Sequence, residues 1–206
     1  MRIFIVMLLT ALAAAGCTTT NNSPIGGAID GSQKWVMLPI LNHTDVPQAG
    51  LRAEAITEGL LRSGGINNLT RYPAALNQDT LFEPAERKVF DEAHKWARSQ
   101  NARYAVYGAV DEWRYKVGID GEPAVGVALH IMDLQDGSVV WSGVGGKSGW
   151  SRESLSGVAQ KLIRSLLATA NIRGTASGPA DGASAAQGSY SSTAGGSGQG
   201  TSSSKD

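Results

Sequence analysis

Residues 34–50 have the sequence KWVMLPILNHTDVPQAG, in which a continuous apolar run leads into a cluster of turn-forming side chains. A short apolar run without alternation predicts a strand over 34–41 that is buried on both faces of a sheet. Residues 42–45 favour a turn, because short polar side chains hydrogen-bond their own backbone. This stretch therefore predicts the central strand of the fold and the turn that follows it.

The rest of the folded region alternates helical and strand patterns before it ends in hairpins. In chain order, we expect a helix over 48–62, a strand over 69–72, a helix that begins at Pro84, strands over 104–117, 124–133 and 139–144, and a helix over 152–170. Asp120-Gly121 and Asp136-Gly137 are typical of hairpin turns, so the last three strands should form an antiparallel meander. The order β-α-β-α-β-β-β-α predicts a single-domain α/β sandwich with a mixed sheet and helices packed on the sheet.

The first 16 residues have the pattern of a bacterial lipoprotein signal peptide. Arg2 precedes an apolar run over 3–15, and Ala14-Ala-Gly-Cys17 supplies small residues before a cleavage site, although the motif usually carries Leu at the position of Ala14. The run of about 13 residues is shorter than the roughly 20 that a membrane-spanning helix needs. We therefore expect lipidation of Cys17, the single cysteine of the chain. An ordinary secretory signal with a chance cysteine is the alternative.

Lipidation would attach the mature chain to a membrane through acyl chains, each of which contributes about 0.8 kcal/mol per buried CH₂. An Asp directly after the cysteine would signal retention in the inner membrane. The chain has Thr18 there, which resembles the pattern of sorting to the outer membrane, so we expect the periplasmic face of that membrane. Without a second cysteine no intramolecular disulfide forms, and stability must come from a packed core.

The chain divides into four zones by composition. We expect a signal peptide over 1–16, a flexible tether over 17–32, an α/β domain over 33–172 and a disordered tail over 173–206. The tether lacks hydrophobic periodicity. The tail is rich in Gly, Ser, Ala and Thr and contains no Leu, Ile, Val or Phe, so it cannot bury enough apolar surface to offset the entropy of ordering.

The charge balance excludes some partners. The chain has 18 basic and 18 acidic residues, and loss of Arg2 with the signal leaves 17 against 18. No basic cluster follows a pattern that would track phosphates, so we expect no nucleic acid partner.

Signatures of catalysis and of metal binding are absent from the sequence. Gly146-Lys-Ser148 resembles the end of a phosphate-binding loop, but the first glycine of that motif would fall on Trp141. His43, His94 and His130 lie in different predicted elements without partners at ligand spacing, which favours structural roles. We expect no enzyme activity, no metal and no cofactor.

Three acidic residues belong to the predicted hairpin turns: Asp120, Glu122 and Asp136. Asp before Gly is ordinary turn chemistry, and this is the simpler interpretation of Asp120 and Asp136. The alternative is that the three carboxylates face a common surface and bind cationic material. In a monomer, screening would weaken that attraction, whereas a ring of identical subunits would repeat the acids around one mouth and focus their potential.

Trp150 lies in the glycine-rich segment 145–151, which has little other apolar content. Its side chain either folds back onto the core or is exposed. An exposed Trp on a lipid-anchored domain suits the membrane interface, where the amphipathic ring partitions.

Several of these segments resemble the PelC family of outer-membrane lipoproteins, which belong to the export machinery of the Pel exopolysaccharide. The similarity covers about residues 34–170. It is carried by 35–50, by YAVYG at 104–108, by EWRYK at 112–116, by GEPAVG at 121–126 and by VWS at 140–142. The strand, turn and helix at the start, taken alone, also resemble the curli secretion lipoproteins of the CsgG type and the LpoB activators of peptidoglycan synthases.

The resemblance implies a homo-oligomeric ring on the periplasmic face of the outer membrane that works with the porin of the Pel system, PelB. The ring would pass a cationic polysaccharide towards the pore. On this account Cys17 anchors the ring, Trp150 contacts the bilayer, and Asp120, Glu122 and Asp136 are candidates for an acidic funnel. An LpoB-like synthase activator and a CsgG-like secretion channel component remain alternatives.

Overall fold

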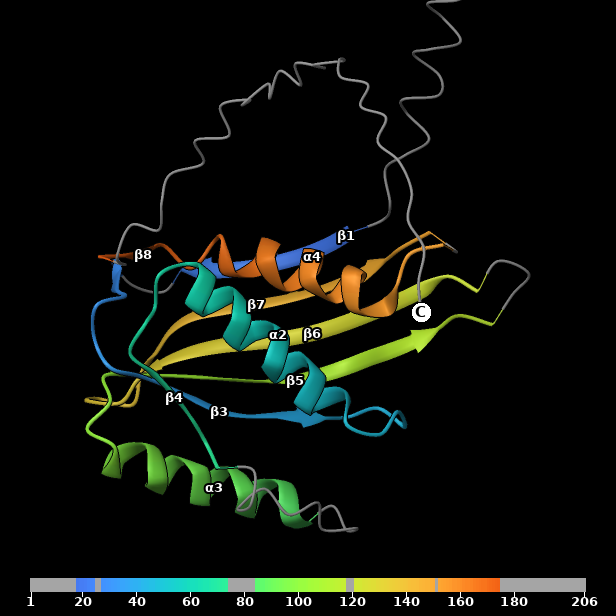
Figure 1. Cartoon of the computed structure of the whole chain (residues 1–206). Coiled ribbons are helices and arrows are strands. Elements are labelled where there is room, and N and C mark those ends of the chain that lie inside the picture. Colours follow the sequence, from blue (N-terminus) through green and yellow to red (C-terminus); the bar gives the residue numbers. More distant parts are fainter. Residues whose placement is uncertain (1–17, 25–26, 74–83, 118–120, 151, 175–206) are drawn as a thin grey trace, which may run out of the picture.

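The computed structural model describes residues 18–24, 27–73, 84–117, 121–150 and 152–174. Its elements follow in chain order as β1 (Thr18–Pro24), β2 (Ile29–Asp30), β3 (Trp35–Asn42), α2 (Ala49–Ser63), β4 (Leu69–Arg71), α3 (Pro84–Ser99), β5 (Tyr104–Tyr115), β6 (Pro123–Asp133), β7 (Val139–Ser148), α4 (Leu155–Leu167) and β8 (Ile172–Arg173). Figure 1 shows that they form one α/β domain, as the alternation of patterns predicted.

Six strands form a mixed sheet in the order β1-β7-β6-β5-β3-β4. β3 pairs in parallel with β4 and with β5, and such parallel neighbours need a crossover connection of the kind that α2 and α3 supply. β5, β6 and β7 form the predicted antiparallel meander, and β1 pairs antiparallel with the outer edge of β7. β2 and β8 form a separate two-stranded parallel sheet.

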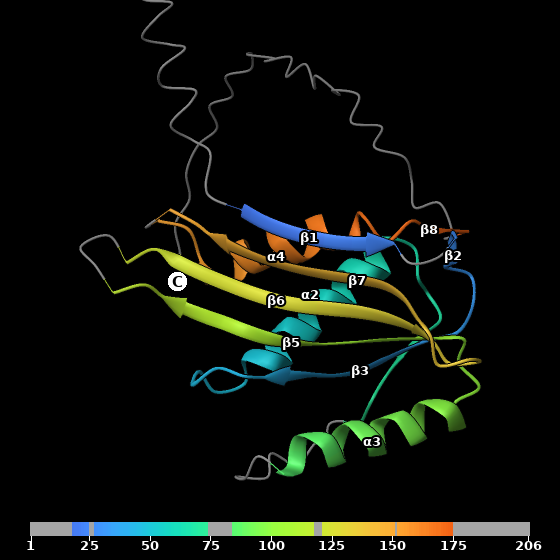
Figure 2. The ribbon, with the colours of Figure 1, turned by 180° about the vertical axis from the view of Figure 1, so that it is seen from behind.

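The helices lie on both faces of the sheet but do not cover it evenly. α2 and α4 lie on one face, and α3 lies on the other face beside β3 (Figures 1 and 2). The larger hydrophobic core lies under α2 and α4 and contains the fully buried side chains of Trp35, Trp113 and Trp141. A smaller cluster lies under α3, where Ala93 packs with Val36 of β3.

The structure differs from the sequence-based expectation at the start of the chain. The expected tether, 17–32, contains β1 and β2, and only its first residue, Cys17, and residues 25–26 lie outside the described part. The segment forms β1 because its backbone pairs with the free edge of β7, and hydrophobic periodicity does not report that kind of order.

Strand β7 also extends further than expected. It continues to Ser148 through a glycine-rich segment that the sequence predicts as a loop, because β6 and β1 pair with its two edges. Asp120 and the tail from residue 175 lie outside the described residues, as does the segment 74–83 before α3.

Helix α2 approaches β3 very closely at Gly50. A Cβ atom placed on this glycine would lie 2.1 Å from the carbonyl oxygen of Ile40, far inside van der Waals contact. Ala53, one turn later, is fully buried against the same core. The Gln-Ala-Gly sequence at 48–50 therefore sets how near the helix can come to the central strand.

One buried carboxylate connects α2, β3 and β4. Glu54 is 4% exposed, and its Oε1 accepts a hydrogen bond from the backbone N–H of Ile40 at 3.0 Å. Its Oε2 accepts from Nε of Arg71 on β4, also at 3.0 Å. The Ile40 N–H is available because the β3–β5 register shifts between Met37 and Ile40, around Pro39. Burial raises the pKa of the Glu54 carboxyl, and the hydrogen bonds from Ile40 and Arg71 oppose that shift.

The first prediction concerns the two glycines of α2. Gly50→Ala should lower the free energy of unfolding by about 1–3 kcal/mol, because the new methyl group forces the helix away from Ile40. Gly59→Ala is the matched control on the same helix. Its Cβ position meets nothing within 4 Å, so it should raise stability by about 0.5–1 kcal/mol. Urea unfolding of the acyl-free protein (Cys17→Ser) measures both, and equal effects would contradict the close approach.

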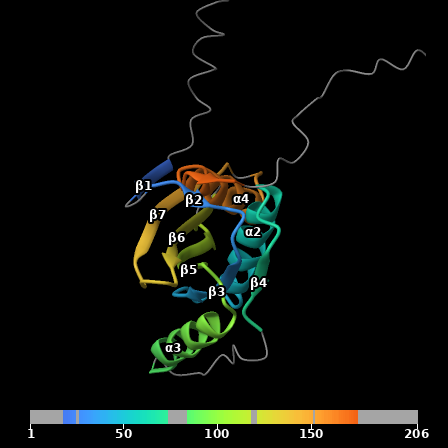
Figure 3. The same ribbon diagram turned by 90° about the vertical axis from the view of Figure 1, so that its left-hand side faces the viewer.

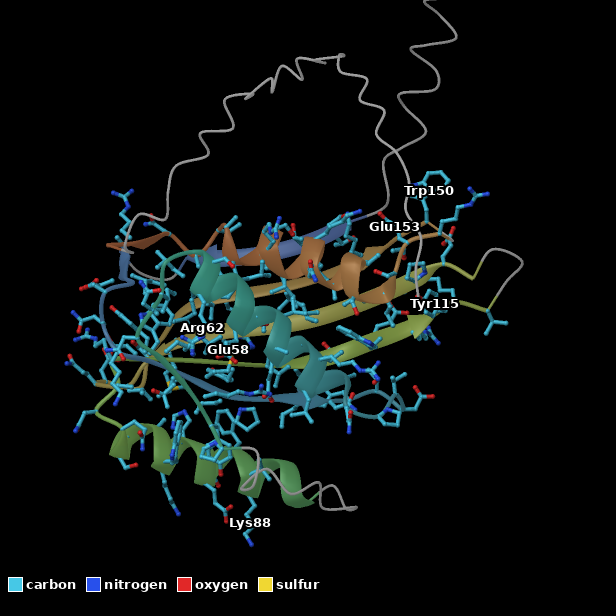
Figure 4. The ribbon with its side chains drawn as sticks, in the orientation of Figure 1. Glu58, Arg62, Lys88, Tyr115, Trp150 and Glu153 are labelled. Atoms are coloured by element: carbon cyan, nitrogen blue, oxygen red, sulfur yellow. The ribbon has the colours of Figure 1, made fainter. Side chains whose placement is uncertain are left out.

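The second prediction concerns the buried carboxylate. Glu54→Ala should cost about 3–5 kcal/mol of unfolding free energy, because it leaves Arg71 and the Ile40 N–H without their partner. Glu58, one turn later, pairs with Arg62 at 2.9 Å near the surface (Figure 4), so Glu58→Ala should cost less than about 1 kcal/mol. If the two variants unfold at the same urea concentration, Glu54 does not hold the helix to the sheet.

Candidate functional site

One end of the sheet collects the start of the described chain, a hairpin and an exposed loop. Thr18, which follows Cys17, pairs with Lys147 near the end of β7. The β5–β6 hairpin lies at the same end, where Ala124 pairs with Ser148. Trp150 follows two residues after Ser148 and lies at this end (Figure 4). We call this the Trp150 end of the domain, and the opposite end, which carries the β6–β7 turn, the Asp136 end.

The Trp150 end carries three of the four highly exposed large apolar side chains of the described residues. Among the described residues, Tyr115, Val117, Val144 and Trp150 are the large apolar side chains with high exposure. Three of them lie at this end: Trp150 is 56% exposed, Tyr115 is 51% exposed, and Val117 is fully exposed. Figure 4 shows Trp150 and Tyr115 close to the same end of the domain. The structure thus favours the exposed alternative for Trp150.

The described residues that flank Trp150 contact the sheet and the neighbouring elements. The N–H of Gly149 donates to the carbonyl of Pro123 at 2.8 Å, and the N–H of Leu155 donates to the Tyr115 hydroxyl at 3.2 Å. Glu153 pairs with Lys161, which lowers the pKa of the Glu153 carboxyl. Gly149 is enclosed, because a Cβ there would lie 2.4 Å from Val158. Gly149, directly before Trp150, is therefore held to the sheet and lies close to α4.

An acidic cleft opens beside the same end, between the β3–α2 loop and β5. It has a volume of about 300 Å³. Its lining consists of His43, Thr44, Asp45, Asp111, Glu112, Trp113 and Arg114. Asp111 lies 2.9 Å from Nδ1 of His43, and Glu112 pairs with Arg114 at 3.1 Å. Three carboxylates thus face one guanidinium and one imidazole, so acidic side chains outnumber basic ones in the lining.

The structure does not bring the described acids of the predicted funnel to one surface. Glu122 is exposed at the Trp150 end, beside the β5–β6 hairpin, and Asp136 is exposed at the Asp136 end. They lie at opposite ends because β6 spans Pro123–Asp133 between them, which is roughly 35 Å of strand. Asp120 lies outside the described residues. The common surface that we expected for these side chains is therefore not formed within one subunit by Glu122 and Asp136.

Asp136 also has a structural role. Its Oδ1 accepts a hydrogen bond from the N–H of Ser138 at 2.8 Å, and hydrogen bonds from Ser138 lower the pKa of its carboxyl. Gly137 adopts a positive φ of 78° in the same turn. This is the turn chemistry that an Asp-Gly pair predicts.

The sequence analysis did not identify the acids of the cleft. Asp45 comes from the loop after β3, whereas Asp111 and Glu112 come from β5, so nothing in their spacing connects them. The sequence contains one signal of this site: Asp111 and Glu112 are consecutive acids that interrupt the apolar strand predicted over 104–117. The structure shows a register shift between Val110 and Glu112, and such bulges re-aim side chains.

Two of the three histidines, His94 and His130, have structural surroundings, whereas His43 lies in the acidic cleft. Nδ1 of His130 lies 2.9 Å from the Ser142 hydroxyl, and His94 packs its ring against Phe90. Burial lowers the pKa of both His94 and His130. Among the described residues, no three His, Cys, Asp or Glu side chains gather to hold a metal. In the same part of the chain, no helix combines the length and apolar character needed to cross a bilayer.

Solved structures include close relatives of this fold and sequence. A PelC dodecamer from Paraburkholderia phytofirmans is 41% identical to this chain, with a TM-score of 0.64, and the match covers 76% of this chain and 99% of the other. A single-substitution variant of a PelC dodecamer from the same organism is 40% identical, with a TM-score of 0.63, and is covered completely. No family model matches the chain, and no curated protein sequence matches it.

Each match spans about three quarters of this chain. The identity is well above the level at which a shared fold alone would be inferred, and it extends over the whole length of the solved relatives. The chain belongs to the PelC family.

Proposed function

We propose that this protein is a non-catalytic, lipid-anchored subunit of a ring that guides a cationic exopolysaccharide to an outer-membrane porin for export. The family supports a role in the Pel system, and the PelC relatives in solved structures are dodecamers. The observation that carries the proposal is the gathering at one end of the domain. The residue after Cys17, the exposed Trp150 and the acidic cleft all lie there.

The position of β1 supports one orientation of the domain on a membrane. Cys17 directly precedes a strand that is hydrogen-bonded to β7 from Thr18 onward, so acyl chains on Cys17 would hold the Trp150 end against the bilayer. Trp150 and Tyr115 then reach the interface, where Trp and Tyr side chains partition favourably. In a ring that rests on a membrane, every copy presents this same end, and the sheet strands run roughly along the ring axis.

The carboxylates supply attraction for a cationic polymer. Asp45, Asp111 and Glu112 lie in the cleft at the Trp150 end, and Glu122 lies beside the neighbouring hairpin. Repeated around a ring, such weak sites raise the local concentration of the polymer without trapping it. Asp136 would then stand at the other mouth of the ring, and Asp120, which lies outside the described residues, keeps its proposed role.

An LpoB-like activator would need to reach across the periplasm to a synthase. Here the chain enters the sheet at Thr18, immediately after the proposed anchor, so no free tether remains to provide that reach. This observation favours the export guide over the activator.

The third prediction tests the anchor. The wild-type protein should incorporate labelled fatty acid and fractionate with the outer membrane, whereas Cys17→Ser should lose both properties.

Trp150→Ala in the acylated protein should weaken binding to vesicles of outer-membrane lipids severalfold, because one large interfacial side chain is lost. Lys88→Ala, an exposed change on α3 far from the Trp150 end (Figure 4), is the control and should bind normally. If the wild-type protein does not incorporate the labelled fatty acid, or if the Trp150 variant binds vesicles normally, the results contradict this orientation.

The fourth prediction tests the acids. The double variant Asp45→Asn and Asp111→Asn should bind partly deacetylated chitosan oligomers several times more weakly than wild type and should secrete less polymer from cells. Added salt should reduce wild-type binding, because exposed charges are screened. Glu122→Gln should act in the same direction.

The variant Asp136→Asn tests the acid at the Asp136 end separately from the acids of the cleft. Asn can accept the same hydrogen bond from Ser138, so the substitution preserves the turn. We expect a smaller loss of binding than for the cleft variant, since Asp136 lies outside the cleft. Circular dichroism and thermal unfolding confirm that each variant folds. Unchanged binding and secretion in all of these variants would remove the carboxylates from the mechanism.

A further inference from the structure

A second cavity lies between α2 and α4, which are side by side on one face of the sheet (Figure 3). Both helices begin at the Trp150 end, and the cavity opens where they finish at the Asp136 end, beside β8. Its volume of about 600 Å³ is in the range of pockets that bind small molecules. We call it the helix-end pocket. Its apolar lining consists of Leu60, Leu61, Ile66, Leu167, Ala168 and Ile172.

The charges of the helix-end pocket have one sign. Its lining contains Arg164 and Arg173 but no acidic side chain. Arg173 donates from Nε to Oδ1 of Asn171 at 3.1 Å, which leaves its two terminal nitrogens without a partner among the described residues. The Arg164 side chain has neither a hydrogen bond nor an ion pair to another described residue. Two guanidinium groups at one apolar pocket therefore have donors to spare.

A neighbouring arginine has a different environment. Arg62, in the last turn of α2, pairs with Glu58 at 2.9 Å and donates to the carbonyl of Leu69 at 2.7 Å. A cation in the last turn of a helix also interacts favourably with the helix dipole, which is the simpler interpretation of Arg164. The dipole does not account for Arg173, because this residue lies on β8. The two arginines together favour an anionic group at the pocket.

The backbone acceptors at the helix ends are already bonded. The carbonyl of Leu60 accepts from the N–H of Gly64 at 2.9 Å, and the carbonyl of Leu167 accepts from the N–H of Ala170 at 3.0 Å. The Ser63 hydroxyl donates to a carbonyl of the preceding turn. A peptide strand needs main-chain groups to pair with, and these are committed here. The pocket therefore suits an apolar chain better than a peptide.

We propose that the helix-end pocket binds a single-chain anionic lipid. The apolar chain would lie against the leucine and isoleucine side chains of the lining, where it is removed from water. The carboxylate or phosphate head would lie at Arg164 and Arg173, since guanidinium groups bind such anions with paired hydrogen bonds.

The ligand is a separate molecule and not an acyl group of the chain itself. Thr18, which follows Cys17, lies at the Trp150 end, whereas the pocket lies at the Asp136 end. Strand β6 separates these ends by roughly 35 Å. The inference therefore depends neither on lipidation of Cys17 nor on the ring.

The fifth prediction tests the ligand class. In calorimetric titrations of the full acyl-free chain (Cys17→Ser), decanoate should bind roughly tenfold or more tightly than decyl maltoside, which has the same chain and an uncharged head. Hexanoate should also bind roughly tenfold or more weakly than decanoate, because it buries fewer methylene groups. Decyltrimethylammonium should not bind. All probes are used below their micelle concentrations. Equal binding of decanoate and decyl maltoside would show that the pocket does not select anions, which overturns the inference.

Variants of the lining locate the binding site. The double variant Arg164→Gln and Arg173→Gln should weaken decanoate binding roughly tenfold or more and abolish the preference over decyl maltoside. Ala168→Trp should weaken binding of both probes, because Ala168 lines the pocket and the larger side chain fills it. Arg52→Gln, an exposed change near the start of α2, is the matched control and should bind decanoate normally. Circular dichroism verifies that each variant folds. Wild-type affinity in the double variant would place the site elsewhere and overturn the inference.

A protein partner would give a different result. A capped tetrapeptide of two leucines flanked by two glutamates offers similar apolar and anionic groups on a peptide backbone. If it binds more tightly than decanoate and loses binding in the same variants, the occupant is an acidic protein segment and the lipid proposal is wrong. If the wild-type chain binds none of the probes, the proposal also fails. Neither result changes the proposed function, because the anchor and the acidic cleft do not include the helix-end pocket.

Discussion

The close approach of α2 to β3 determines how the rest of the domain is arranged. Gly50 lets the helix come within contact distance of the Ile40 carbonyl, and Glu54 bonds the Ile40 N–H and Arg71 from the same helix. One helix is thereby tied to the central strand and to the edge strand β4. The β3–α2 loop that precedes this contact is short and fixed at both ends, and it forms one wall of the acidic cleft. A packing constraint in the core thus positions polar residues at the surface.

The sequence predicts the parts of the fold that depend on local chemistry. Apolar runs, alternation and Asp-Gly turns were enough to find β3, the meander and all three described helices. Strand β1 could not be found this way, because its side chains are polar and its order comes from the backbone of β7. The extension of β7 to Ser148 has the same origin. Order that a segment gains from a distant partner leaves little trace in the segment itself.

In the candidate site, too, local sequence predicts some features, whereas others depend on contacts between distant segments. Trp150 stood out in the sequence because a large aromatic residue in a glycine-rich segment has few local neighbours, and it is exposed in the structure. The grouping of hairpin acids was misjudged, since Glu122 and Asp136 lie at opposite ends of β6. The acids of the cleft come together only through the parallel pairing of β3 with β5. Residues brought together by a crossover connection have no fixed spacing that a motif could reveal.

The pairing of β1 with β7 has a mechanical consequence. Its hydrogen bonds run perpendicular to the strand over seven residue pairs, from Thr18 to Pro24. A force that pulls the start of β1 out of the Trp150 end acts along the strand, so it shears all of these bonds together instead of unzipping them one after another. Such a force would therefore be shared along the whole strand, and the pairing would resist rupture better than the same bonds peeled from one end.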